Sequence, residues 1–318
     1  MDEEPYASDG TDDTDTDAEQ VAEIRASESL SELRTQFETE SIHEAYFRAK
    51  DVWKSTVDPT WWDVSDSGGL PGTCVRLDGH AFHVHGVTHA DTPEERAFLR
   101  THVRRYLDRD ASVYCEQGIR PLYFQDFEGV CEMDDYRWAM EQCVQLAGES
   151  WLGPLEETPF DALLEDVSSI ASTFREATFS VIESGASVYG DRFERVLADV
   201  AAAFVTDHAD LATAKNYESF SLSRDASRNP DRLRDLQRYY ARAFLPQPLE
   251  REWLRRHDPE LEVVTHARNE RMAEYAVYHH DNASEVHLLV GAAHGPGIRH
   301  YLKQFQQGRT VPPSFEPL

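Results

Sequence analysis

Alternation of apolar and polar side chains predicts several short strands in this 318-residue chain. Residues 73–77 and 81–87 alternate in this way, and Asp78-Gly79 between them is typical of the turn of a β-hairpin. Two further apolar runs, at residues 111–115 and 285–290, have the length and composition of strands. A sheet that contains all of these runs must pair segments from opposite ends of the chain.

Apolar residues recur at helical spacing between the predicted strands. The clearest helix starts at Pro93, with Thr92 as its N-cap and Glu95 three residues after the cap. This helix connects two predicted strands and completes a β-α-β unit. We also predict helices at residues 27–54, 133–152, 268–280 and 297–307, and a short strand at residues 261–265.

These elements indicate an α/β (α+β) fold with a mixed β-sheet core and flanking helices. Residues 160–256 are almost wholly helical in pattern, so we expect a large helical insertion at about residues 155–258. Residues 1–26 are rich in Asp, Glu, Thr and Ser, which predicts a disordered acidic tail. Residues 27–318 are expected to form a single domain.

The chain is strongly acidic, with 59 acidic residues against 31 basic ones and a formal net charge of −28. Only four of its basic residues are lysines: Lys50, Lys54, Lys215 and Lys303. An acidic, lysine-poor surface suits a halophilic protein in a high-salt cytoplasm, where salt screens charges within a few ångströms. It argues against nucleic-acid binding, which needs clustered Lys and Arg.

The sequence also argues against several other classes of protein. The start Met1-Asp2-Glu3-Glu4 is the reverse of a basic signal-peptide start, and no apolar run approaches the roughly 20 residues of a membrane span. No two of the four cysteines have Cys-x-x-Cys spacing, so a zinc knuckle is not expected. Glycine-rich nucleotide loops and the Gly-x-Ser-x-Gly elbow are absent, so no organic cofactor is expected. We expect a cytoplasmic protein with no integral membrane segment; its oligomeric state stays open.

One short motif occurs twice, each time at the end of a predicted strand. Its copies are Gly86-Val87-Thr88-His89 and Gly291-Ala292-Ala293-His294. Ligands of open α/β sheets bind beyond the carboxyl ends of the strands, and neutral imidazole is both a common metal ligand and a general base. The leading glycines let the backbone turn sharply or approach a ligand closely. Either histidine alone could simply cap the next helix, but the repetition favours one shared site.

Glu116 is a third candidate, because it directly follows the apolar run at residues 111–115. A carboxylate in that position is unfavourable unless it is paired, and it could ligate a metal or act as an acid or base. Arg120, four residues on, is a candidate partner for Glu116. The alternative is a surface glutamate that starts a loop.

Arg268 and Asn269 stand at the start of the helix predicted at residues 268–280. A guanidinium binds a carboxylate or an oxyanion in a forked geometry, although a solvated helix face is the alternative. His83 and His85 form a His-x-His pair like that of amidohydrolases, but the chain lacks the eight β-α units of such a barrel. We expect these two histidines to pack in the structure or to support the site.

Taken in order, these residues resemble the TraB/PrgY family and the related Tiki metalloproteases. The resemblance rests on four blocks, at residues 85–89, 113–120, 268–273 and 290–298. The last two blocks are the more specific, because the family's pattern there is Arg-Asn-x-x-Met-Ala and then Val-Gly-x-x-His-x-x-Gly-Ile. The resemblance implies an α/β core with two histidines, one glutamate and one arginine around a single pocket.

The resemblance also implies a metal-dependent hydrolase of TraB/Tiki type that cleaves a peptide or amide bond. Its substrate would be a small peptide or another small molecule. In this role His89 and His294 would bind a divalent Mn, Co or Zn ion, and Glu116 would be a third ligand or the base. Arg268 would stabilise the oxyanion.

Two other functions stay open. The distant erythromycin-esterase relatives of this superfamily suggest a metal-independent esterase or amidase that uses His89 or His294 as general base. A non-catalytic regulatory protein could instead bind a peptide or another ligand through the same histidines.

Overall fold

The computed structural model describes residues 12–59, 69–135, 138, 216–257, 262–280 and 283–309. Its strands are β1 (Thr73–Leu77), β2 (His80–Val87), β3 (Ser112–Cys115), β4 (Val130–Glu132) and β5 (Glu285–Gly291). They form one sheet in the order β1-β2-β5-β3-β4. β1 runs antiparallel to β2 and the other three pairs are parallel, which confirms the predicted mixed sheet and α/β class.

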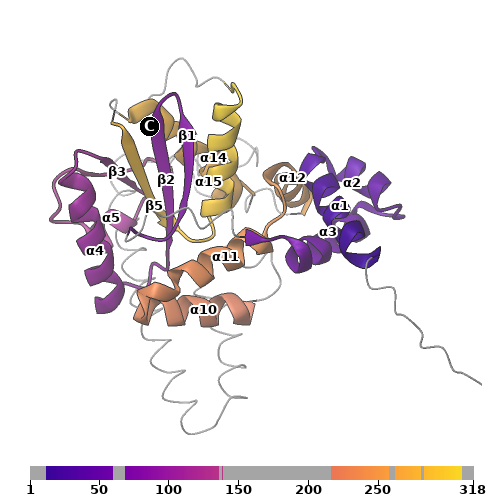
Figure 1. Cartoon of the computed structure of the whole chain (residues 1–318), viewed down its shortest axis with the longest axis horizontal. Coiled ribbons are helices and arrows are strands. Elements are labelled where there is room, and N and C mark those ends of the chain that lie inside the picture. Colours follow the sequence, from indigo (N-terminus) through magenta and orange to yellow (C-terminus); the bar gives the residue numbers. More distant parts are fainter. Residues whose placement is uncertain are drawn as a thin grey trace, which may run out of the picture.

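The C-terminal strand β5 lies in the middle of the sheet, between β2 and β3 (Figure 1). A central strand covered on both faces is expected to be a nearly continuous apolar run, as β5 is. Its register pairs Val87 with Gly291, and Cys115 with Leu289. The carboxyl ends of β2, β5 and β3 therefore meet at one edge of the sheet.

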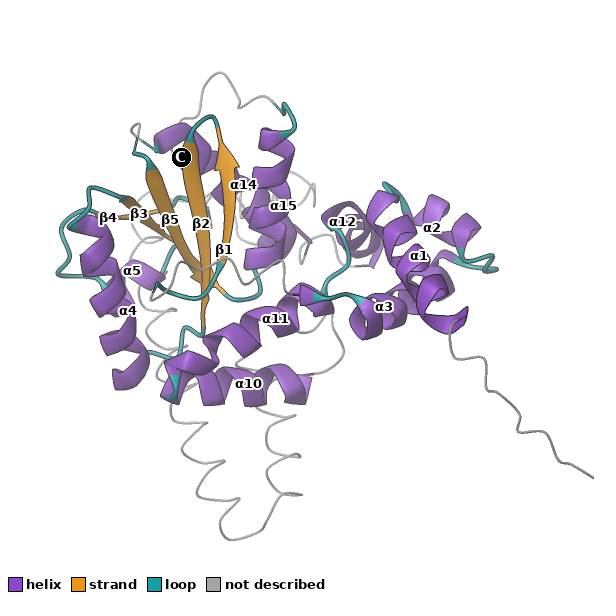
Figure 2. Ribbon diagram, in the orientation of Figure 1, coloured by secondary structure: helices purple, strands orange, loops and turns teal. Residues whose placement is uncertain are grey.

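Helices cover both faces of this sheet (Figure 2). Helices α14 (Arg268–His279) and α15 (Gly295–Gln306) pack on Val286, Leu288 and Val290 of β5. Helices α4 (Pro93–Leu107) and α5 (Ile119–Tyr123) pack on Leu289, which points to the opposite face. The predicted start of α4 is confirmed, because Thr92 caps it by accepting a hydrogen bond from the Glu95 N–H.

Three helical segments lie beyond the carboxyl edge of the sheet: α10 (Asn216–Arg228), η2 (Pro230–Arg232) and α11 (Leu233–Ala243) (Figure 1). Gln237 of α11 donates to the carbonyl of Gly86 at 2.9 Å. Thr92 donates to the carbonyl of Ser227 at the end of α10. These contacts attach the described part of the predicted insertion to the first Gly-x-x-His loop.

The other helices form a lobe beside the sheet (Figure 2). It consists of α1 (Asp12–Ala26), α2 (Leu30–Gln36), α3 (Ile42–Thr56) and α12 (Gln247–His257). Tyr46 of α3 stacks on Trp253 of α12 at a centroid distance of 4.2 Å, and its hydroxyl donates to Glu250 at 2.7 Å. This lobe therefore joins the N-terminal helices to a segment that precedes α14.

The structure corrects three sequence predictions. The single helix predicted at residues 27–54 is two helices, α2 and α3, separated by residues 37–41. Residues 12–26 of the predicted disordered tail form helix α1, whose Val21 and Ile24 are buried in the lobe. The strand predicted at residues 261–265 is instead the π-helix η3 (Val263–Ala267), which leads directly into α14. The structure also contains β4, which the sequence pattern did not predict.

Several predictions fall partly outside the described residues. These are residues 1–11 of the tail, most of the helix at 133–152, and residues 155–215 of the insertion. The described remainder of the insertion, residues 216–257, is helical as predicted. Within the described ranges, no helix is both long enough and apolar enough to cross a membrane.

The predicted packing histidines are part of a stack of rings on the α4 face of the sheet. His85 Nε2 lies 2.9 Å from His287 Nδ1, and Tyr106 stacks on His287 at a centroid distance of 3.7 Å. The ring of His83 also stacks on His287, at a centroid distance of 4.7 Å. Burial is the largest cause that lowers the pKa of His85 to about 3, and it also lowers the pKa of His287.

We predict that this stack makes the protein less stable as the pH falls below neutrality. In the unfolded chain the imidazoles of His85 and His287 titrate near pH 6.5, so between about pH 6.5 and 3 the unfolded state binds protons that the folded state does not. His85 and His287 should each lower the free energy of unfolding by up to about 1.4 kcal/mol per pH unit in that window. Denaturant titrations from pH 7.5 to 4.5 at constant salt measure this slope.

The control is His287→Phe, which keeps a stacking ring but removes one titrating group. We expect a visibly shallower pH slope in this variant than in the wild type. Equal slopes in both proteins would contradict the assignment.

Candidate active site

The two predicted histidines lie close together at the carboxyl edge of the sheet. His89 follows the end of β2 and has a backbone φ of 58°, a left-handed conformation that is uncommon for a residue with a side chain. His294 immediately precedes α15 and is fully buried. The Nε2 atom of His89 lies 3.4 Å from Glu116 Oε2, and that of His294 lies 3.5 Å from Glu116 Oε1. The structure thus brings together the three side chains that the sequence analysis proposed as ligands.

Glu116 is held by the backbone and by Arg268. Its N–H donates to the carbonyl of Leu289 in β5, which fixes its backbone at the sheet edge. Its Oε2 accepts the N–H of Gly291 at 2.6 Å, and its Oε1 accepts from Arg268 Nη2 at 2.7 Å. Burial alone would raise the pKa of Glu116, but the charges of His294, Arg268 and His89 outweigh it and hold the pKa well below its usual range.

Arg268 binds a second carboxylate, that of Asp135. Its Nε donates to Asp135 Oδ2 at 2.7 Å, and Asp135 Oδ1 accepts the N–H of Gln117 at 3.0 Å. Burial, with a contribution from the charge of Glu116, raises the pKa of Asp135, although Arg268 acts in the opposite direction. When both carboxylates are ionised, one guanidinium faces two negative charges, and the cluster has a net charge that favours a further cation.

The two motif glycines leave room for this arrangement. A Cβ atom on Gly291 would lie 3.0 Å from His89 Nε2 and 3.4 Å from Glu116 Oε2. A Cβ atom on Gly86 would lie 2.8 Å from the Cα of Ala292. The glycines are therefore needed for close packing of the site, as the sequence predicted, and at neither position for a positive φ.

Asn269 determines which nitrogen of His294 faces the carboxylate. His294 Nδ1 lies 2.7 Å from Asn269 Oδ1, and an amide oxygen can only accept a hydrogen bond. In the neutral imidazole the proton is therefore on Nδ1, and Nε2 presents a lone pair towards Glu116. A lone pair and a carboxylate 3.5 Å apart are stabilised either by a cation between them or by protonation of the ring.

The distances around Glu116 fit a shared metal ion. Two ligand atoms bound at about 2.1 Å to one tetrahedral ion are about 3.4 Å apart, which is close to both histidine–carboxylate distances. Two imidazoles and a carboxylate are a donor set of known catalytic metal centres. However, in the described part of the chain no three His, Cys, Asp or Glu side chains form a ready-made ligand set. Binding would therefore require these side chains to draw together.

One sequence prediction about the site is wrong. Arg120 does not provide the charge partner of Glu116, because its Nε donates to the carbonyl of Val130 at 2.9 Å. Arg268, which is far away in sequence, takes that place. The predicted roles of Arg268 and Asn269 near the histidines are consistent with their positions.

Three buried residues near the site were missed by the sequence analysis: Asp135, Gln247 and His266. Asp135 follows β4, a three-residue strand too short to be recognised from its pattern. Gln247 begins α12 and His266 lies in the π-helix, and no motif marks either of them. His266 adjoins α14 in sequence, whereas only the tertiary structure brings Asp135 and Gln247 to α14.

Comparisons of this chain with protein-family models, with curated proteins and with solved structures found no match. The relation to the TraB/PrgY family therefore stays a prediction that rests on the four sequence blocks and is compatible with the geometry of the site.

We predict that Arg268 is the residue that neutralises the buried carboxylates. Arg268→Met leaves Glu116 and Asp135 without a cation and should reduce the free energy of unfolding by about 3–5 kcal/mol at pH 7. The loss should be smaller at pH 5, because the carboxylates can then take up protons. Urea unfolding at both pH values measures it.

The matched control is Arg120→Met, in the short helix α5 that follows Glu116. It removes one hydrogen bond to a backbone carbonyl and should reduce the free energy of unfolding by about 1 kcal/mol, with little pH dependence. Equal losses in the two variants would show that Arg268 has no special role.

Proposed function

We propose that this protein is a metal-dependent hydrolase that cleaves a peptide or amide bond in a small substrate. The observation that carries the proposal is the convergence of His89 Nε2 and His294 Nε2 on the buried carboxylate of Glu116, at distances expected between ligands of one ion. The choice of a peptide or amide bond rests on the resemblance to Tiki metalloproteases.

The side chains divide into ligands and supports. His89, His294 and Glu116 would hold a divalent Mn, Co or Zn ion. Such an ion lowers the pKa of a bound water towards neutrality and polarises a substrate carbonyl. Glu116 would be a third ligand or would take the proton of the attacking water.

His89 is the most accessible of the three, with 26% of its side chain exposed, whereas Glu116 and His294 are buried. Substrate would therefore reach the site from the side of His89. Arg268 keeps Glu116 ionised and in place, and we propose that its positive charge also stabilises the oxyanion of the tetrahedral intermediate.

A metal-independent esterase or amidase is the second candidate. Both oxygens of Glu116 already accept hydrogen bonds, from Arg268 and from the Gly291 N–H, which is how a carboxylate that orients a histidine would be held. In this candidate His89 would remove a proton from water without a metal. A protein that binds a peptide without turnover would use the same contacts and show no hydrolysis.

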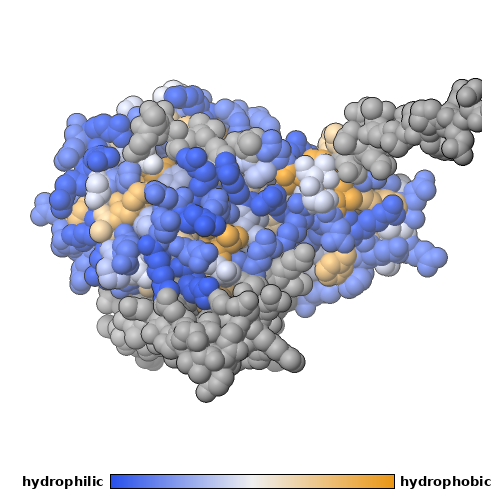
Figure 3. All heavy atoms as spheres, turned by 60° about the horizontal axis from the view of Figure 1, so that its bottom comes forward, coloured by the Kyte–Doolittle hydropathy of each residue, from blue (hydrophilic) through white to orange (hydrophobic). Residues whose placement is uncertain are grey.

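The composition supports a cellular location as part of this proposal. Because the chain has a net charge of −28 and few lysines, and the described part of the face in Figure 3 is mostly hydrophilic, we propose that it works in a high-salt cytoplasm. Assays of activity and binding are therefore best done in concentrated KCl.

The first experiment measures metal binding. Chelated protein in high salt is titrated calorimetrically with Zn²⁺, Mn²⁺ and Co²⁺, and we expect one ion per chain. His89→Gln and His294→Gln should each weaken binding by more than about 100-fold, which exceeds the effect of removing a supporting residue. The matched control is His83→Gln, in the ring stack of β2, which should bind like the wild type.

The second experiment measures hydrolysis with panels of peptide, amide and ester substrates. The proposal expects cleavage of peptides or amides that stops on chelation and returns with metal, and that falls at least about 100-fold in Glu116→Gln. Full activity after chelation would support the metal-free candidate and contradict ours. Peptide binding without any cleavage, in the presence of metal, would favour the binding protein.

A further inference from the structure

A chain of buried side-chain hydrogen bonds leads away from the candidate site through His294. Asn269 accepts from His294 Nδ1 at 2.7 Å and donates through Nδ2 to Gln247 Oε1 at 3.4 Å. The same oxygen of Gln247 lies 3.1 Å from His266 Nδ1. All four side chains are buried, with at most 3% of any residue exposed. Buried side-chain hydrogen bonds of this kind restrict the orientation of the groups that they join.

The donor and the acceptor of each hydrogen bond in this series of side chains can be assigned without conflict. His266 Nδ1 must donate, because Gln247 Oε1 can only accept. Burial is the largest cause that lowers the pKa of His266 to about 3, so this ring is neutral and has a single proton. Since Gln247 Oε1 also accepts from Asn269 Nδ2, the amide of Asn269 has its oxygen towards His294.

Packing also restricts the amide of Asn269. A Cβ atom on Gly297, in the first turn of α15, would lie only 2.1 Å from Asn269 Nδ2. Glycine at this position therefore leaves space for the amide between α14 and α15 and little space beyond it. This gives a structural reason for the glycine three residues after His294.

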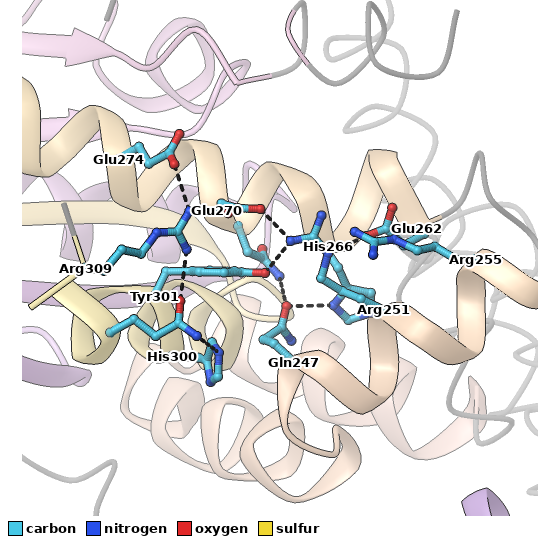
Figure 4. Close-up of polar contacts among 12 residues, drawn as sticks. Gln247, Arg251, Arg255, Glu262, His266, Glu270, Glu274, His300, Tyr301 and Arg309 are labelled. Atoms are coloured by element: carbon cyan, nitrogen blue, oxygen red, sulfur yellow. Dashed lines mark hydrogen bonds and ion pairs between the residues drawn. The ribbon is translucent and has the colours of Figure 1, made fainter. Parts of the chain in front are cut away.

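The helices that carry these hydrogen-bonded side chains are held together by ion pairs around Arg251 of α12 (Figure 4). Its guanidinium binds Glu262, which precedes the π-helix, and Glu270 of α14. It also donates to the hydroxyl of Tyr301 in α15 at 2.6 Å. These contacts hold the elements that carry Gln247, His266 and Asn269 in one relative position.

We propose that Gln247 and His266 are positioning residues, which act through Asn269 to keep the proton of His294 on Nδ1 and its Nε2 lone pair towards Glu116. Gln247 is distant from the candidate site in sequence, His266 precedes Arg268 by two residues, and the hydrogen bonds given above link both to His294 only through Asn269. The proposal deepens the proposed function, because a ligand or a general base at position 294 needs that lone pair. Its test does not depend on metal or turnover.

The test is the tautomer of His294, measured by the ¹⁵N shifts of its ring in the metal-free full-length protein at a pH where the ring is neutral. The wild type should show only the Nδ1–H form. Gln247→Met, which keeps the length of the side chain but has no acceptor, should lose that single tautomer and show the Nε2–H form as well. Gln247→Glu restores an acceptor and should restore the wild-type spectrum.

Two further variants serve as a matched control and as a substitute for Gln247→Met. Gln307→Met is the matched control at an exposed position after α15, and it should leave the tautomer unchanged. His266→Phe keeps an aromatic ring but removes the donor to Gln247. It should shift the tautomer as Gln247→Met does, and it replaces that variant if Gln247→Met does not fold. Circular dichroism and thermal unfolding confirm that each variant is folded.

A wild-type tautomer in folded Gln247→Met or His266→Phe would overturn the proposal. A tautomer lost equally in Gln247→Met and Gln247→Glu would also overturn it, because the acceptor would not be the cause. If the metal titrations fail while the tautomer depends on Gln247, the hydrolase proposal is wrong and the positioning role stands.

Discussion

The parallel pairing of β2 with β5 is the constraint on which the rest of the structure depends. It joins the two ends of the chain at the centre of the sheet and aligns Val87 with Gly291. Side chains alternate along a strand, so a shift of one residue in this register would turn every β5 side chain to the opposite face. The two buried faces of β5 differ, because Val286, Leu288 and Val290 pack on α14 and α15 whereas His287 stacks on Tyr106 of α4, so the shift would place an imidazole in the apolar cluster. The positions of both Gly-x-x-His motifs follow from this register.

The structure also requires that the buried carboxylates at the carboxyl ends of the strands are neutralised. Glu116 and Asp135 are buried, and one guanidinium, that of Arg268, lies between them. Burying unpaired carboxylates is strongly unfavourable, so the position of Arg268 is fixed by the two groups it neutralises. The excess negative charge of the two carboxylates and the imidazole nitrogens of His89 and His294 would together suit a divalent ion or a proton. Glu116 therefore belongs both to the ion pair that stabilises the fold and to the proposed metal site.

The parts of the fold that could be predicted from the sequence are those determined by neighbouring residues along the chain. The hairpin at Asp78-Gly79, the cap at Thr92 and the apolar run of β5 each have a signal within a few residues. The convergence of His89, Glu116 and His294 was also predictable, because strand ends of a parallel sheet meet at one edge. The family resemblance pointed to the same side chains.

What the sequence could not show depends on contacts between distant elements. Arg120 was the wrong partner for Glu116, because proximity in sequence says nothing about which cation lies across the sheet edge. Gln247 and His266 have no motif, and their relation to His294 exists only when α12, the π-helix and α14 are packed. The helix at residues 12–26 was missed because its few apolar residues gain burial only against other helices of the lobe.

We propose that His89, Glu116 and His294 surround one divalent ion. Anomalous diffraction from crystals soaked in Zn²⁺ or Mn²⁺ tests it most directly. We expect one strong peak per chain within about 2.0–2.2 Å of both Nε2 atoms and of a Glu116 oxygen. The absence of a peak there at saturating metal, or a strong peak only elsewhere, would contradict the account.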